Sequence, residues 1–328
     1  MPLWAAFSTY GKDKDYVQSI LMHNLLHHFR RQKANLHIVH CPLMAGGNRP
    51  HLVKNDIDWI MASSTPPNTL LYVDTHSDVA TGQIIYGGSA PRHLAAALAE
   101  IIDAFYGKQL QPILRGLHST SIRGLVLLTC GSAIRVPTGH QALTELVESG
   151  TFDFVLAFAG HSTIDHLVGP GILKFVESVY VFKESPWEAV ISSFAGDVRA
   201  LESTPVALIF RPKVEAGATP VTETRILARS TFLRPWGIDL YRCRNVACRQ
   251  PILHLKFNVQ KKSKDWTQLM YRSKCCKCHQ ETRNYARPTW VHPIEGTVIH
   301  HTWFNWPLTD VQLAEVHAKR EDIVNWLM

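Results

Sequence analysis

GLVLLTCGSA, residues 124 to 133, ends a run of apolar residues with a cysteine followed by a glycine. Residues 124–128 are apolar enough for a strand that is covered on both faces, as strands of a parallel sheet are. Cys130 then lies where the strand ends and the chain turns. In open α/β sheets this carboxyl edge is where ligands bind. The stretch therefore predicts a buried parallel strand with a cysteine at the functional edge of its sheet.

The first two thirds of the chain alternate strand-like and helix-like patterns, which is typical of βαβ units. Six strands are predicted, within residues 4–10, 36–41, 69–76, 124–130, 152–160 and 205–212. Helices are expected at 16–31, 51–64, 91–107 and 139–150, a further helix within 171–194, and a short hairpin at 81–88. The predicted fold class is α/β, with a mainly parallel six-stranded sheet.

The positive charge is concentrated in the last third of the chain. The whole sequence carries 34 Lys and Arg against 27 Asp and Glu, whereas residues 236–305 carry 12 against 4. We therefore expect an α/β domain over 1–212, a connector over 213–235 with a possible strand at TETRILA, and a basic module over 236–305. Residues 306–328 are expected to be a terminal helix with Thr309 as its N-cap.

Composition excludes several classes of protein. With 46% hydrophobic and 19% charged residues the chain resembles an ordinary globular protein. No apolar run approaches the roughly 20 residues that cross a bilayer, and the N-terminus lacks the layout of a secretory signal. Seven cysteines, five of them between Cys243 and Cys278, favour a metal site in a reducing compartment over a disulfide framework. The expected location is the cytoplasm or nucleus, with no membrane association.

His76 and Cys130 occupy comparable positions in the pattern. Each ends a predicted strand, and the two strands are consecutive and joined through one helix, so they are expected to be neighbours. A thiolate is a strong nucleophile, and a nearby imidazole promotes its formation and protonates a leaving amine. The pair is therefore a candidate catalytic dyad, in which Gly131 allows a sharp turn that exposes backbone N–H groups to an oxyanion. Cys41, which lacks a following glycine, is interpreted as a core residue.

At these residues the chain resembles the caspase-like (clan CD) cysteine peptidases, most closely the CHAT-type branch. The family has a histidine at the end of the third strand and a cysteine at the end of the fourth, about 50 residues apart in caspases. The resemblance covers residues 4–212 and implies a caspase-like three-layer sandwich. It also implies that His76 is the general acid and base, that Cys130 is the nucleophile, and that a protein is the substrate.

The chain departs from the family pattern beside both residues. The family has glycine after the histidine, where a backbone N–H helps to form the oxyanion hole, and here Ser77 stands instead. The Gln-Ala-Cys motif of caspases is replaced by Leu128-Thr129-Cys130. The cleft is expected to include Ser77, Gly131 and His161. Three acidic residues are candidates for binding a basic substrate side chain: Asp78, Asp153 and Asp165.

The cysteine-rich module has the outline of a zinc ribbon. Cys243-x4-Cys248 and Cys275-x2-Cys278 are two pairs that can supply four thiolates to a tetrahedral structural zinc. Cys276 and His279 are alternative ligands for the second pair. A small β-rich zinc-ribbon-like domain is therefore expected, with flanking strands at HLKFNV and WTQLMYR.

Two functions remain open at the level of sequence. The first is a cysteine endopeptidase that acts through an acyl-enzyme on Cys130. The second is a catalytically inactive caspase-like scaffold that binds protein or nucleic acid through its basic module. Aromatic residues interleaved with the basic ones suit stacked bases; they are Tyr241, Trp266, Tyr271, Tyr285 and Trp290.

Overall fold

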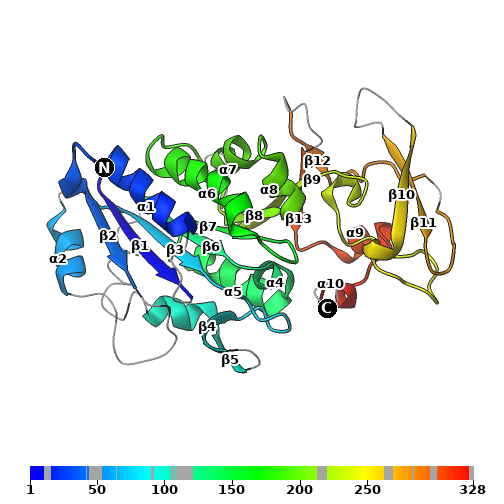
Figure 1. Cartoon of the computed structure of the whole chain (residues 1–328), viewed down its shortest axis with the longest axis horizontal. Helices are drawn as coiled ribbons and strands as arrows, with labels where there is room; N and C mark the ends of the chain where they lie inside the picture. The colour runs from blue at the N-terminus through cyan, green and yellow to red at the C-terminus, as the bar shows by residue number, and fades with distance from the viewer. Residues whose placement is uncertain are drawn as a thin grey trace.

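A nine-stranded mixed sheet forms the centre of the computed structural model, in the order β12-β13-β9-β8-β7-β6-β3-β1-β2 (Figure 1). Its parallel strands are β1 (Leu3–Thr9), β2 (Leu36–His40), β3 (Asn68–Asp74), β6 (Arg123–Leu128) and β7 (Phe154–Phe158). Its antiparallel strands are β8 (Val206–Phe210), β9 (Glu223–Arg229), β13 (His301–Trp306) and β12 (His292–Pro293). The structure describes residues 1–10, 16–41, 43, 54–63, 65–89, 92–104, 107, 121–212, 220–261, 269–282, 284–295 and 301–324.

Helices cover both faces of the sheet. One face carries α1 (Tyr16–His28), α6 (Asp165–Tyr180), α7 (Pro186–Phe194) and α8 (Val198–Ser203), and the other carries α2 (Lys54–Ala62), α4 (Ser132–Arg135) and α5 (Pro137–Glu148) (Figure 1). The alternation of side chains along β1 accounts for two cores: Leu3, Ala5 and Phe7 join one, and Trp4 and Ala6 join the other. The α/β class with a largely parallel sheet is confirmed. Among the described residues, no helix combines the length and the apolar character needed to span a bilayer.

The sheet is wider than the six strands expected from the sequence. All six predicted strands are present, and the possible strand at TETRILA in the expected connector is β9. Together with β12 and β13 from the last third of the chain, β9 extends the sheet beyond β8. Residues 213–219 of the expected connector lie outside the described residues. Pairing between distant strands has no local sequence signal, because register is set by long-range packing. The sequence boundaries at 213, 236 and 306 therefore do not coincide with the edges of the sheet.

The segment after β3 also differs from its prediction. The hairpin consists of β4 (Ile84–Ser89) and β5 (Arg92–Ala96), so Arg92–Ala96 pair with β4 instead of opening a helix. Helix begins only at residue 98 and is described to 104. Alanine and leucine favour helix, but the ladder with β4 satisfies the backbone of β5 and overrides that weak preference. Residues 171–194, within which one helix was predicted, contain the end of α6 and the whole of α7, whose N-cap is Ser185.

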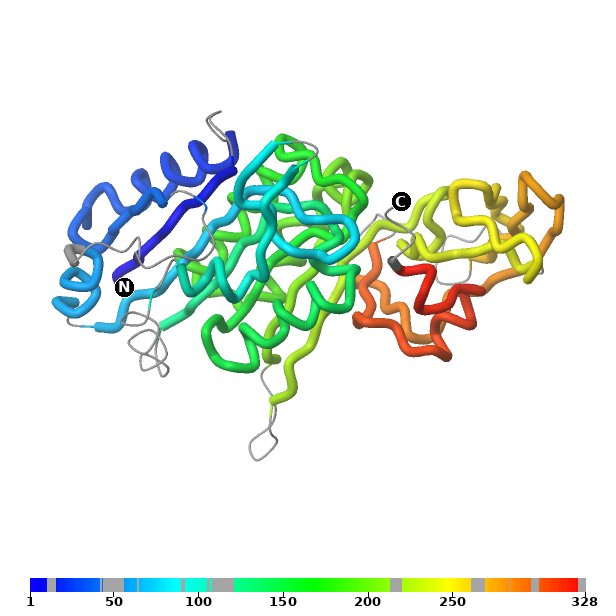
Figure 2. The backbone as a smooth tube through the Cα atoms, turned by 90° about the horizontal axis from the view of Figure 1, so that it is seen from below, coloured from blue at the N-terminus to red at the C-terminus, as the bar shows by residue number. Residues whose placement is uncertain are grey.

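The chain beyond β9 returns to the sheet after building a small β-rich part. It contains short 3-10 turns at η2 (Pro235–Gly237) and η3 (Ile252–His254), and an antiparallel hairpin of β10 (Leu255–Lys261) and β11 (Met270–Cys275). This part lies at the end of the molecule away from the N-terminus (Figure 2). The expected terminal helix is two helices, α9 (Asp310–Glu315) and α10 (Arg320–Val324), because His317 has a positive φ of 59°. Thr309 is confirmed as the N-cap of α9.

His140 of α5 gives the fold a dependence on pH. Its Nε2 lies 2.8 Å from Thr224 Oγ1 on β9, and burial lowers the pKa of this histidine to about 4. Because the unfolded chain binds this proton near pH 6.5, the free energy of unfolding is expected to fall as pH decreases from 6.5 to 4, by on the order of 2–3 kcal/mol. Denaturant unfolding at several pH values measures this dependence, and the free energy of unfolding of His140→Gln should fall less between pH 6.5 and 4. An equal decrease in both proteins would contradict the role of His140.

Candidate functional site

The parallel ladder between β3 and β6 brings His76 and Cys130 to one edge of the sheet. Asp74 at the end of β3 pairs with Leu128 at the end of β6, so His76 and Cys130 each lie two residues beyond matched strand ends. The N–H of Thr75 donates to the carbonyl of Leu128 at 3.0 Å and extends the ladder by one step. The two side chains therefore start from equivalent positions at the carboxyl edge.

Both residues line one cleft of about 360 Å³ at that edge. Cys130 is half-buried and His76 is exposed. The ring of Tyr10, which follows β1, packs edge-on against His76 at 6.2 Å, and its hydroxyl donates to the carbonyl of Gly88 in the β4–β5 hairpin. No hydrogen bond joins Cys130 to His76 among the described residues. Catalytic hydrogen bonds are often long in free enzymes and tighten only around the substrate.

Hydrogen bonds hold the turn that carries Cys130. The Ser77 hydroxyl donates to the carbonyl of Cys130 at 2.9 Å and accepts from Ser132. The N–H of Gly131 donates to the carbonyl of Gly160, beyond the end of β7, at 2.7 Å. The Ser77 side chain therefore links the loop after His76 directly to the backbone of Cys130.

Gly131 is required by close packing and not by a sharp turn. Its φ of −67° is open to any residue. A Cβ at this position would lie 2.5 Å from the carbonyl oxygen of Gly160 and 2.6 Å from the carbonyl carbon of Ala159, both of which are backbone atoms. The expectation that Gly131 frees the backbone to turn is therefore corrected: the glycine lets two strand ends approach.

Gly131→Ala is expected to lower the free energy of unfolding by about 1–3 kcal/mol, because backbone atoms cannot move aside as a flexible side chain can. Chemical denaturation measures the change. Gly196→Ala is the matched control, since a Cβ there meets nothing within 4 Å. Equal stability of the two variants would contradict the close approach.

Of Ser77, Cys130 and Gly131, the residues whose backbone N–H groups lie beside the candidate dyad in sequence, only Cys130 lines the cleft, and Ser77 is buried. Within the described residues, the N–H groups of Ser77 and Cys130 donate to no other group, whereas that of Gly131 is engaged by Gly160. The backbone N–H that follows His76 is therefore present and free of other acceptors within the described residues, although the residue is serine and not glycine. Gly131 belongs to the support of the cleft and not to its donors.

The other predicted cleft residues lie in different places. Asp165, the first residue of α6, lines the cleft. Asp78 is held within its own turn by the backbone N–H groups of Ala80 and Thr81 and by the Thr81 hydroxyl, and Asp153 pairs with the buried Arg123 at the opposite edge of the sheet. His161 is exposed and is not part of the cleft lining, to which its loop contributes Thr163.

Asp74 lines the cleft and was missed by the sequence analysis. Its position, the last residue of a strand that leads to the candidate histidine, is the signal that could have found it. Among the described residues that line the cleft, Asp74 and Asp165 are acidic and none is Lys or Arg. The described Asp, Glu, Lys and Arg side chains of the lining are therefore all acidic.

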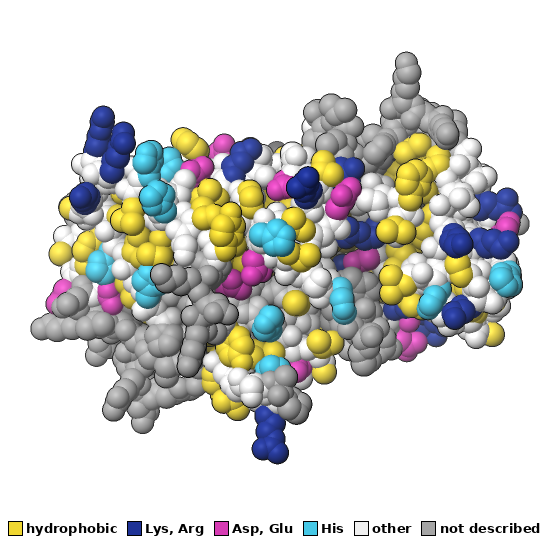
Figure 3. Space-filling model, viewed as in Figure 1, with side chains coloured by type: hydrophobic (Ala, Val, Ile, Leu, Met, Phe, Trp, Pro, Cys, Tyr) yellow, Lys and Arg dark blue, Asp and Glu magenta, His cyan; other side chains and the backbone are white. Residues whose placement is uncertain are grey.

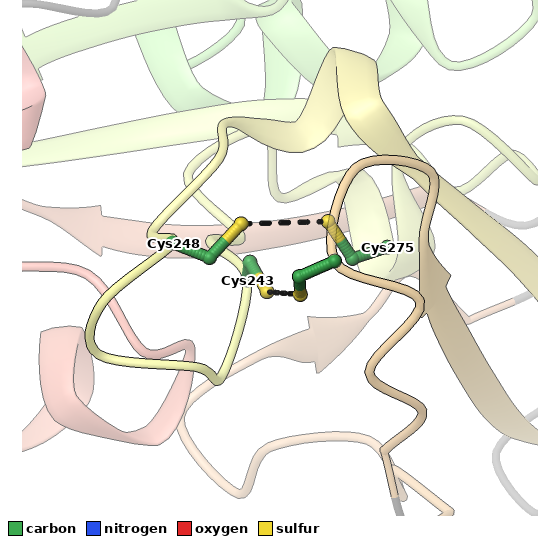
Figure 4. A group of neighbouring side chains, drawn as sticks. Cys243, Cys248 and Cys275 are labelled. Atoms are coloured by element: carbon green, nitrogen blue, oxygen red, sulfur yellow. Dashed lines mark hydrogen bonds between the residues drawn. The ribbon is translucent and has the colours of Figure 1, made fainter.

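The four predicted cysteine ligands come together in space. The sulfur atoms of Cys243, Cys248, Cys275 and Cys278 lie within 4.8 Å of one another. Two loops contribute them and face each other across the sulfurs (Figure 4). The Sγ–Sγ distances are 3.4 Å for Cys243–Cys278 and 3.8 Å for Cys248–Cys275, too long for disulfides. Zinc–sulfur bonds of about 2.3 Å in a tetrahedron place sulfurs about 3.8 Å apart, so the cluster could hold a metal ion such as zinc.

Backbone N–H groups point at the sulfurs, as they do toward thiolates. Burial raises the pKa of Cys243 to about 12, and an N–H from Asn245 opposes this. The N–H of Gln280 lowers the pKa of Cys278 to about 7, and the N–H of Lys277 lies 3.4 Å from Cys275 Sγ. Four sulfurs this close cannot all be ionised without a compensating cation, and a bound metal supplies that charge.

The alternatives for the second cysteine pair lie outside the cluster. Cys276 is exposed, and its N–H donates to the carbonyl of His254. His279 has a φ of 59° and is exposed at the end of the turn, where its N–H donates to the carbonyl of Cys275. The cluster thus contains the four cysteines predicted from the sequence as Cys243-x4-Cys248 and Cys275-x2-Cys278.

Comparison of the chain with protein-family models, with curated proteins and with solved structures gave no match in any of the three. The interpretation of the cleft and of the cysteine cluster therefore depends on their own geometry.

Proposed function

We propose that the chain is a caspase-like cysteine endopeptidase of the CHAT type, with a zinc-ribbon-like module at its C-terminal end. The observation that carries the proposal is the shared cleft of His76 and Cys130 at matched strand ends. A cysteine and a histidine placed on neighbouring strands at the carboxyl edge are the two groups that acyl transfer requires.

The proposed reaction follows from the groups present. Sγ of Cys130, after giving its proton to His76, attacks the substrate carbonyl, and the backbone N–H group of Cys130, which lines the cleft, stabilises the oxyanion. His76 then protonates the leaving amine, and the C–N bond breaks to leave an acyl-enzyme on Cys130. Water, deprotonated by His76, hydrolyses the thioester, and the thiol regains its proton.

The carboxylates of the cleft support a preference for a basic residue at the cleaved bond. Asp165→Asn is expected to lower kcat/KM on fluorogenic peptides with Arg or Lys before the cleaved bond by about 10-fold or more, since a charged hydrogen bond is worth about 1.5–3 kcal/mol. Glu145→Gln, on the exposed surface of α5, is the matched control. Faster cleavage of acidic or apolar peptides by the unaltered protein would contradict the preference.

Zinc is the proposed metal of the cysteine cluster, in a structural role. Four thiolates with no open position suit structural zinc and leave no place for a catalytic water. The presence of several reduced thiols supports a location in the cytoplasm or nucleus.

The second candidate function is binding of a partner by the basic module, with or without catalysis. Lys256 and Lys274 are paired across the β10–β11 hairpin and are exposed, and Arg272 is exposed as well. Several Lys and Arg side chains gather at this end of the molecule, on the right of the view in Figure 3. Glu281 forms ion pairs with both Arg272 and Lys274, which reduces the charge available to phosphates.

The aromatic residues of the module give little support to base stacking. Tyr241 and Tyr271 are buried, and Tyr285 and Trp290 are partly buried in the same core. Trp266 lies outside the described residues. Fluorescence anisotropy with single-stranded and duplex oligonucleotides tests this function: nucleic-acid binding requires an affinity that falls steeply with salt, and no binding at 50 mM salt would exclude it.

A further inference from the structure

Arg135, at the end of α4, is a buried cation close to the turn of Cys130. Its side chain is 1% exposed. Nε donates to the carbonyl of Ala159 at 3.0 Å, and a terminal nitrogen donates to Asp239 at 2.7 Å. Because α4 starts directly after Gly131, Arg135 and Gly131 together fasten the segment that follows Cys130 to the end of β7.

Asp239 reaches Arg135 from the part of the chain that holds the cysteine cluster. It is 5% exposed and precedes Cys243 by four residues. The residues between them include Leu240 and Tyr241, both buried in the core that continues under α5. The Tyr241 ring packs against Phe257 of β10 at 5.4 Å. The position of Asp239 is therefore set by the packing around the first cysteine of the cluster.

A second contact runs parallel to the ion pair. The indole N–H of Trp306, at the end of β13, donates to the carbonyl of Ile134 at 3.0 Å. The guanidinium of Arg135 lies over the same indole, 5.0 Å from its ring centre. Two residues of α4 are thus held by the C-terminal third of the chain, through a carboxylate and through an aromatic ring.

We propose that metal binding at the four-cysteine cluster and the order of the Cys130 turn are linked, with Arg135 and Asp239 as the positioning residues that connect them. This deepens the proposed function, on which it rests: the metal site stabilises the geometry of the peptidase cleft. Metal loss loosens the chain around Cys243 and with it Asp239. A buried guanidinium that loses its carboxylate is costly, so the α4 segment opens to solvate it.

Amide hydrogen exchange on the full chain tests the link. The probe is zinc itself: protein saturated with zinc is compared with protein depleted by a chelator. Depletion is expected to speed exchange in the peptide covering residues 131–135 by at least 10-fold, while the peptide covering β3 stays protected. Unchanged exchange at 131–135 in protein proven to be zinc-free would overturn the proposal.

Asp239→Asn separates charge from shape, since the two side chains are nearly isosteric. With zinc retained, this variant should speed exchange at 131–135 as depletion does. Because coupling between two sites is reciprocal, a change that disorders residues 131–135 should also weaken zinc binding by the same factor. Competition with a chromophoric chelator measures the zinc affinity. Asp239→Glu, which keeps the carboxylate, is expected to restore both. Glu223→Gln, which removes the separate pair with Arg225 on β9, is the matched control.

The outcomes distinguish this link from the peptidase proposal. Normal exchange and normal zinc affinity in Asp239→Asn would overturn the link even if the protein hydrolyses peptides through Cys130. Coupled changes in exchange and zinc affinity would support it even if no hydrolysis is found, and the peptidase proposal alone would then fail. If zinc depletion also exposes β3, global unfolding has occurred, and the zinc-loaded Asp239→Asn protein decides the outcome.

Discussion

Cys130→Ala is expected to reduce peptide hydrolysis by roughly 10⁴-fold or more, because removal of the nucleophile removes the covalent route. The melting temperature should stay nearly unchanged, since the sulfur lies in a cleft and is half-buried. Initial rates on a fluorogenic peptide and a thermal melt measure the two effects on one preparation. His76→Ala should reduce the rate of hydrolysis by a similar factor. The double variant should be only slightly slower than either single variant, because the members of a dyad act as a unit.

Cys41→Ala is the matched control for that result. Cys41 is 6% exposed and packs in the core, as the sequence analysis expected. Its removal should lower the free energy of unfolding by roughly 1–2 kcal/mol and leave the activity of each folded molecule intact. If Cys130→Ala retains hydrolysis, or loses stability as Cys41→Ala does, Cys130 is a packing residue.

The second large effect is expected at the cysteine cluster. Purified protein should carry close to one zinc per chain, and Cys243→Ser should release it. Binding free energy at such sites is on the order of 10 kcal/mol and is largely folding free energy. The region around β10 and β11 should therefore unfold, as measured by atomic emission for the metal and by limited proteolysis for the fold.

Cys276→Ser is the control for this prediction, because Cys276 is exposed and lies outside the cluster. It should retain both the metal and the resistance to protease. Metal-free protein with an intact β10–β11 hairpin and a cooperative melt would contradict a structural role for the cluster.

Local sequence patterns were sufficient to predict the strands that carry the candidate site. Buried apolar runs mark β3 and β6, and the order of strands brings His76 and Cys130 to one edge. The cysteine spacing indicated the cluster, because two pairs on two turns are a local signature of a metal site.

Features that depend on distant pairing were not accessible in this way. β13 joins the sheet by pairing with β9, which lies more than 70 positions earlier in the chain, as His301 does with Arg229. Asp239 shows no local sign of its pairing with Arg135, because a buried ion pair is defined by two segments that meet only in the fold. Gly131 could be assigned a tight turn or a close approach, and only the position of Gly160 decides between them.

Competition between the thiols for alkylation measures whether His76 activates Cys130. Zinc-loaded protein is treated at neutral pH with a limiting amount of iodoacetamide, and modification of each cysteine is followed by peptide mass spectrometry. Cys276 is the exposed reference, and burial raises the pKa of Cys41 to about 11, which keeps that thiol slow. We expect half-buried Cys130 to react well ahead of Cys276, and we expect His76→Ala to remove this advantage. A Cys130 that reacts no faster than Cys276, or equally fast without His76, would contradict this expectation.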